Sequence, residues 1–276
     1  MHTAIIHPAA IAIEKVPVYF SVNEIKVKRY TLCLEMVGTI LNDLSINKRA
    51  DTASLFHTLG QIAYCVDSPL DDLSLEQKEK LFVLFPGFFD ALSKQAGEKE
   101  FNNALRDLCD QLNTSLYPPS LCIDLFRFYD LCKKHDLLQA LKTFSITVVE
   151  AAILKCRAKN ANEILKSLEL EGNAAVSFLL KLLQKENLVH HSQKNFKKTR
   201  AYLSCLEKML NVADDLYDHK KDAAKGIITL KTGISYYFIL SRQLLKLFFT
   251  ATFRYNFLFF RHFIVFTHRY IRSEFA

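Results

Sequence analysis

Residues 194–222 read KNFKKTRAYLSCLEKMLNVADDLYDHKKD, and this stretch decides the fold class. It contains no proline, and its apolar residues recur at three- and four-residue spacing, which predicts one long amphipathic helix. The predicted apolar stripe consists of Leu203, Leu206, Met209, Leu210 and Ala213. The opposite face is polar along its length and carries Arg200, Ser204, Glu207, Lys208 and Asn211.

The rest of the 276-residue chain follows the same pattern. All six prolines lie at or before Pro119, so the remaining chain suits long helices. Turns are expected at Pro118-Pro119, at Gly172-Asn173 and at residues 190–192. Apolar spacing predicts helices at residues 22–44, 52–66, 75–94, 98–112, 120–133, 137–158, 161–168, 174–184, 194–222 and 234–272. We therefore expect one all-α domain, a helical bundle over residues 1–276.

Charge and cysteine usage narrow the function classes. The net charge of +7 permits an anionic ligand, a phosphate-bearing substrate or an acidic membrane surface. Nucleic acid is not expected as a partner, because no dense Arg/Lys tract with interleaved aromatics occurs. The seven cysteines form no CxxC pair, which disfavours zinc, and their odd number indicates a reduced compartment. With no convincing signal peptide, a cytoplasmic location is expected.

The end of the 194–222 helix carries a cluster of acids. Asp214, Asp218 and Asp222 are spaced i, i+4 and i+8, and Asp215 lies within the same arc of the helix. Carboxylates this close repel one another, so a compensating cation is expected. Magnesium is the natural candidate because it prefers carboxylate oxygens and shares its shell with phosphate.

Two lysines beside this cluster have two interpretations. Lys221 and Lys225 could hold a diphosphate next to the metal ions. Alternatively, Asp218 with Lys221 and Asp222 with Lys225 form ordinary surface ion pairs on a solvated helix face.

A second acidic stretch, DSPLDD, occupies residues 67–72. Reading back from Asp67, the preceding helix shows Tyr64, Gly60 and Phe56 on one face, which is apolar and leaves room. A carboxylate at the mouth of an apolar channel suits a ligand with a charged head and a greasy tail. The alternative is helix capping, by residues 68–71 and by a capping box of Ser74 with Gln77.

Two aspartate-rich motifs in this order in an all-helical chain resemble the class I isoprenoid synthase superfamily. The DSPLDD stretch resembles the D-x-x-x-D-D motif of squalene synthases, and residues 214–218 read as D-D-x-x-D. The spacing of Asp214, Asp218 and Asp222 is similar to that of the second metal motif in terpene cyclases. The resemblance implies a bundle around a central apolar cavity, magnesium held between the motifs, and departure of diphosphate from a prenyl substrate.

Roles for single residues follow from the resemblance. The expected metal ligands are Asp67, Asp71, Asp214, Asp215, Asp218 and Asp222. Asp67, Asp218 and Lys225 are expected to be catalytic. The expected substrate-binding residues are Phe56, Gly60, Tyr64, Lys221, Lys225, Arg269 and Tyr270.

The expected activity is that of a magnesium-dependent terpene cyclase acting on a prenyl diphosphate. A prenyl-condensing transferase is the alternative enzyme, although the paired arginines of chain-elongating relatives are missing here. A helical interaction protein or a membrane-peripheral protein, without catalysis, stays open, as does a homodimer.

The C-terminal residues 234–272 form an amphipathic basic–aromatic helix in this prediction. Arg242, Lys246, Arg254, Arg261 and Arg269 fall on one side of it. Such a helix either closes the core of the domain or rests on a membrane surface.

Overall fold

The fold is all-α, as predicted. A computed structural model describes residues 24–43, 59–60, 63–64, 66, 69–93, 97–114, 119–185, 193–224, 233–255, 260, 264–265 and 268. The α-helices are α1 (Glu24–Asp43), α3 (Leu75–Leu92), α4 (Glu98–Leu112), α5 (Pro119–Lys134), α6 (Leu138–Arg157), α7 (Ala161–Lys185), α8 (Gln193–Ala224) and α9 (Ile234–Phe249). A π-helical turn, η1 (Thr250–Tyr255), follows α9 directly.

Local capping explains where several helices begin and end. Ser74 accepts a hydrogen bond from the Gln77 backbone N–H at 3.2 Å, and the Gln77 side chain accepts one from the Ser74 N–H at 2.8 Å. This confirms the capping box expected from the sequence and fixes the start of α3. At the end of α4, Asn113 takes the left-handed conformation with φ of 51°, which stops the helix.

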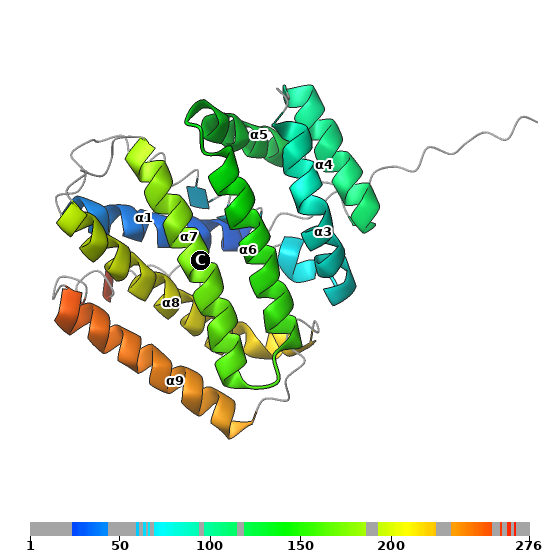
Figure 1. Cartoon of the computed structure of the whole chain (residues 1–276). Coiled ribbons are helices and arrows are strands. Elements are labelled where there is room, and N and C mark those ends of the chain that lie inside the picture. Colours follow the sequence, from blue (N-terminus) through cyan, green and yellow to red (C-terminus); the bar gives the residue numbers. More distant parts are fainter. Residues whose placement is uncertain are drawn as a thin grey trace, which may run out of the picture.

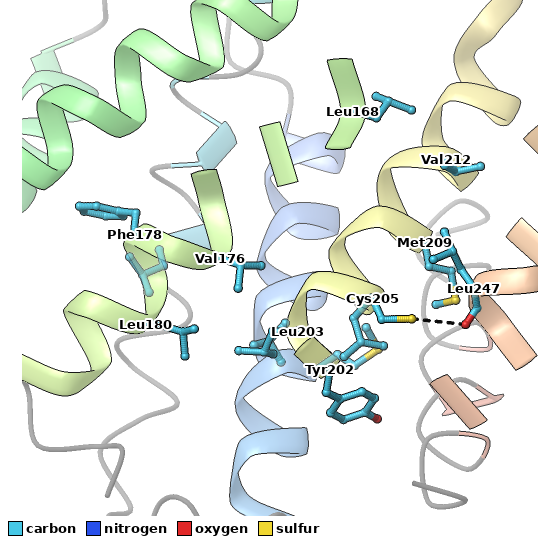
Figure 2. Close-up of a cluster of buried hydrophobic side chains, with 14 of the residues drawn as sticks. Leu168, Val176, Phe178, Leu180, Tyr202, Leu203, Cys205, Met209, Val212 and Leu247 are labelled. Carbon is cyan, nitrogen blue, oxygen red and sulfur yellow. Dashed lines mark hydrogen bonds between the residues drawn. The ribbon is translucent and has the colours of Figure 1, made fainter. Parts of the chain in front are cut away.

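The centre of the bundle is α7, which packs between α6 and α8 (Figure 1). Ile164, Leu182 and Leu183 on α7 are completely buried in the main core. On the far side of α6 lies α3, and on the outer side of α8 lies α9. Figure 2 shows the α8–α9 contact, where the Cys205 thiol donates to the Leu247 carbonyl at 3.4 Å.

The expected turn at Gly172-Asn173 is wrong, because α7 runs unbroken through it. Gly172 instead marks the close approach of α7 to α8. A Cβ atom at this position would lie 3.1 Å from Cγ of Glu207. The glycine therefore lies at a tight helix contact, which a sequence pattern does not distinguish from a turn.

The described residues of the helix expected at 234–272 are helical, but they do not form one uniform α-helix. The α-helix α9 ends at Phe249, and the next six residues form the π-turn. Arg254 and Tyr255 close this turn, and among the residues beyond it only four isolated positions are described. No helix in the described part of the chain is long and apolar enough to cross a bilayer.

We predict that Leu183→Ala lowers the free energy of unfolding by about 2–5 kcal/mol, because it opens a cavity in the main core, where α7 buries this leucine completely. The matched control is Leu154→Ala on α6, where the leucine is 43% exposed and the loss should be much smaller. Urea denaturation followed by circular dichroism measures both. Equal losses would contradict the placement of α7 at the centre.

Candidate functional site

The structure describes only part of the predicted site. Asp67, Phe56, Lys225, Arg269 and Tyr270 lie outside the described residues, as does the expected turn at residues 190–192. Asp218, Lys221 and Asp222 belong to α8, but their side chains are likewise outside the description. The described members are Gly60, Tyr64, Asp71, Asp214 and Asp215.

Asp214 and Asp215 are neighbours in α8 with different surroundings. Asp214 is exposed to solvent. Asp215 faces inward and is only 2% exposed, and its Oδ1 lies 2.6 Å from Nζ of Lys155 on α6. A buried carboxylate needs such a partner, because leaving water without one costs several kcal/mol. This ion pair therefore joins α6 to α8.

A second lysine, Lys78 on α3, is buried next to this pair. Its ammonium donates to the Leu73 carbonyl at 2.5 Å, and 1% of the residue is exposed. Burial lowers the pKa of Lys78. The nearby Cys156, Asp71 and Asp72 oppose this shift, and the charge of Lys155 adds to it. Lys78 thus interacts electrostatically with Lys155, Asp71 and Asp72.

The two acidic stretches are therefore linked through two lysines, because Asp71 and Asp72 act on Lys78, Lys155 also acts on Lys78, and Lys155 pairs with Asp215. We call Asp71, Asp72, Lys78, Lys155 and Asp215 the lysine-bridged acidic cluster. It draws on the helical residues 69–72 before α3 and on α3, α6 and α8, so the acidic stretches do not lie on opposite surfaces of the bundle. Lys78 and Lys155 were not identified from the sequence as members of this cluster, although the sequence pattern around Lys78 indicates that this residue is buried. It stands in line with Leu81 and Phe85, at an apolar position of the α3 pattern.

The side chains of the lysine-bridged acidic cluster can be compared with the ligands that the expected magnesium would need. Lys155 supplies the positive charge beside Asp215, so this carboxylate does not need a divalent cation and does not fit as a ligand in this arrangement. Within the described residues, no three His, Cys, Asp or Glu side chains come together as a metal site. Asp71 and Asp214 keep carboxylates that would suit magnesium, together with acids outside the description.

Gly60 and Tyr64 pack against α1. A Cβ atom on Gly60 would lie 2.5 Å from the Cα of Thr31, so the glycine allows a close backbone approach. Tyr64 is completely buried, and its ring meets that of Tyr30 edge-on at 6.0 Å between centroids. In the described part of the chain, the room that the sequence suggested beside these two residues is filled by α1.

Two hollows lie on the surface formed by the described residues. The larger, of about 530 Å³, lies between the start of α6 and the end of α7. The smaller, of about 410 Å³, lies between α7 and α9. Neither is lined by a member of the lysine-bridged acidic cluster. The central apolar cavity stays a prediction.

His219 is a buried polar group that the sequence reading did not single out. It lies one turn after Asp215 on α8 and is 4% exposed. Its Nδ1 is 2.7 Å from the hydroxyl of Tyr237 on α9, and its ring contacts that of Tyr236. His219 thus ties the acidic end of α8 to the start of α9.

No protein-family model, curated protein or solved structure matches this chain. Proposals on its function therefore rest on its residues and their geometry.

We predict that Lys155→Met lowers the free energy of unfolding by about 3–5 kcal/mol, because it removes the lysine charge from the buried Asp215. The double variant Lys155→Met/Asp215→Leu should regain most of this loss. Lys142→Met is the control, since it breaks the pair with the exposed Asp90 and should cost about 1 kcal/mol or less. Equal costs for the two single variants, in urea denaturation, would refute a buried pair.

The lowered pKa of Lys78 gives a pH dependence. Between this pKa and the ordinary value of 10.5, the unfolded chain binds more protons than the folded chain, so stability rises with pH. The unfolding free energy of the wild type should therefore rise relative to that of Lys78→Met from neutral to alkaline pH. Lys80→Met, which changes an exposed lysine on the same helix, should stay parallel to the wild type. Parallel profiles for all three would count against a buried Lys78.

Proposed function

We propose that the chain is a class I isoprenoid-synthase-like enzyme that ionises a prenyl diphosphate, as a terpene cyclase does. The observation that supports this is that two acidic stretches, about 140 residues apart in sequence, are linked through Lys78 and Lys155 in the lysine-bridged acidic cluster. Diphosphate chemistry needs carboxylates and cations in one place, and this end of the bundle brings both together.

The residues of the lysine-bridged acidic cluster would have different roles in binding the diphosphate. Lys78 and Lys155 would offer positive charge to the diphosphate, and a bound anion would offset the cost of keeping Lys78 buried. Asp215 would hold Lys155 in position through their ion pair. When bound, magnesium would supply Lewis-acid charge to the leaving group, with Asp67, Asp71, Asp214, Asp218 and Asp222 as its ligands.

The proposed chemical step is heterolysis of the bond between the prenyl carbon and the diphosphate oxygen. The electron pair leaves with the diphosphate, and an allylic cation remains. Donors that lie close to the leaving oxygen stabilise the transition state more than the substrate, because the negative charge grows there during the step. The two lysines are the described residues best suited to this role.

A second candidate is a helical interaction protein without catalysis. The observation that favours it is the Lys155–Asp215 pair itself, which already neutralises the buried carboxylate without any ligand. In that case the cluster serves only to join α3, α6 and α8. Both candidates agree with the all-α fold.

The test is incubation of the full chain with magnesium and geranyl, farnesyl or geranylgeranyl diphosphate, with diphosphate release as the readout. We expect release by the wild type, and a rate about 100-fold lower for Asp214→Asn and for Asp218→Asn. Asp107→Asn, at an exposed acid of α4, should match the wild type.

Two outcomes would count against the proposal. No release from any of the three substrates, by a chain that is folded by circular dichroism, would leave the interaction protein as the better candidate. Release that is unchanged in both α8 variants would place the active site elsewhere in the chain.

A further inference from the structure

The outer face of α9 is apolar although it points away from the bundle. Ile234, Phe238, Leu245, Phe249 and Phe253 are between 53 and 91% exposed. The inner face of the same helix is closed by Tyr236, Leu240 and Leu247, all of which are buried. In Figure 1, α9 lies along the edge of the molecule, with α8 on its inner side. The helix therefore contributes to the core and also shows a second apolar face to solvent.

This outer face forms one continuous stripe. Its members are Ile234, Phe238, Arg242, Leu245, Phe249 and Phe253, spaced three or four residues apart. The rings of Phe249 and Phe253 stack with centroids 6.0 Å apart. Phe260, itself 43% exposed, extends the surface through its contact with Phe248. We call this surface the α9 stripe.

The charge of this part of the chain has one sign. From Ala223 to Ser273 there is no Asp or Glu, whereas Lys225, Lys231, Arg242, Lys246, Arg254, Arg261, Arg269 and Arg272 are basic. When Glu274 is included, residues 223–276 have a net charge of +7, which is the net charge of the whole chain. The first 222 residues therefore have a net charge of zero. Arg242 lies within the α9 stripe and Lys246 beside it, and both are exposed. An apolar stripe flanked by basic residues is complementary to a membrane surface that combines anionic headgroups with apolar acyl chains.

A hollow with hydrogen-bond donors opens beside the stripe. This is the smaller hollow, of about 410 Å³, between α7 and α9. Arg242, Gln243, Lys246 and Asn162 supply polar groups, and Leu165 and Ile239 complete the lining. Among the described residues, no acidic side chain lines this hollow. Guanidinium and ammonium groups side by side are suited to a phosphate group.

We propose that the α9 stripe docks on an anionic lipid bilayer and that the hollow between α7 and α9 holds a lipid phosphate headgroup. The phenylalanine rings would enter the boundary between headgroups and acyl chains, while Arg242 and Lys246 would stay at phosphate level. A second copy of the chain fits this surface less well. A symmetric pair of stripes would bring two sets of these cations together, and residues 223–273 contain no acid to offset them. The proposal is independent of any catalytic activity.

The test is flotation of the full chain with vesicles of phosphatidylcholine alone or with added phosphatidylserine. We expect flotation with the anionic vesicles only, weakened by salt. Arg242→Glu/Lys246→Glu should weaken binding by about tenfold or more, because each basic residue near an anionic surface contributes about fivefold. Its matched control is Lys181→Glu/Lys185→Glu, the same charge change at exposed positions of α7 away from the stripe.

The apolar part of the stripe has its own variants. Phe238→Ser/Phe249→Ser should also lose about tenfold or more in binding, since each buried ring adds apolar area. Phe82→Ser/Val83→Ser on α3 removes two exposed apolar groups elsewhere and should bind like the wild type. The chain has no tryptophan, so Phe249→Trp gives a single probe. Its emission should shift to the blue with anionic vesicles, and that of Val83→Trp should not.

Each of the following results would overturn the proposal. The first is no flotation of the wild type, and the second is equal flotation with neutral and anionic vesicles. The third is undiminished binding by Arg242→Glu/Lys246→Glu, which would exclude the headgroup site. The fourth combines two measurements: light scattering shows a wild-type dimer that becomes a monomer in Phe238→Ser/Phe249→Ser, and neither the wild type nor this variant binds vesicles. That result would assign the α9 stripe to a second copy of the chain.

Discussion

The ion pair between Lys155 and Asp215 is the constraint on which the acidic end of the bundle depends. A carboxylate that is almost wholly removed from water has to meet a cation, and Lys155 reaches it from the neighbouring layer. The pair requires the Asp215 side of α8 to face inward, towards Lys155 on α6. With Asp215 turned inward, Asp214 is left in solvent, and the two adjacent acids take on different surroundings.

The same constraint brings α3 into the arrangement. Lys78 is buried close to Lys155, and two like charges in a dry environment would be unfavourable without acids nearby. Asp71 and Asp72 supply this compensation from the helical residues before α3, and the Leu73 carbonyl accepts the Lys78 hydrogen bond. The cluster is thus nearly balanced by protein groups alone. A diphosphate ligand would compete with Asp71, Asp72 and Asp215 for the charges of Lys78 and Lys155. This competition would make the free energy of binding less favourable.

Much of the fold could be predicted from local patterns. Helical periodicity gives the class and most helix positions, and the Ser74–Gln77 capping box gives the start of α3, since both depend on near neighbours. Two features of the helices are not visible in the periodic pattern. Gly172 lies where α7 approaches α8 closely, and α9 gives way to a π-turn where a periodic pattern continues. Of the site, the acids could be found because they cluster in sequence, but Lys78 and Lys155 could not be paired with them. The apolar pattern of α3 marks the position of Lys78 as buried, but it does not say which charged groups lie nearby, because Lys78, Lys155 and Asp215 come from three different helices.

The π-turn after α9 has a geometric consequence for the surface it carries. In an α-helix, each step of four residues overshoots a full rotation by about 40°, so a row built from such steps winds slowly around the axis. A π-turn holds more residues per rotation, and a step of four within it falls short of a full circle. Phe253 is thereby rotated back over Phe249, in agreement with their stacked rings. The widened turn keeps the row straight, and a straight row can lie along a flat plane over its whole length.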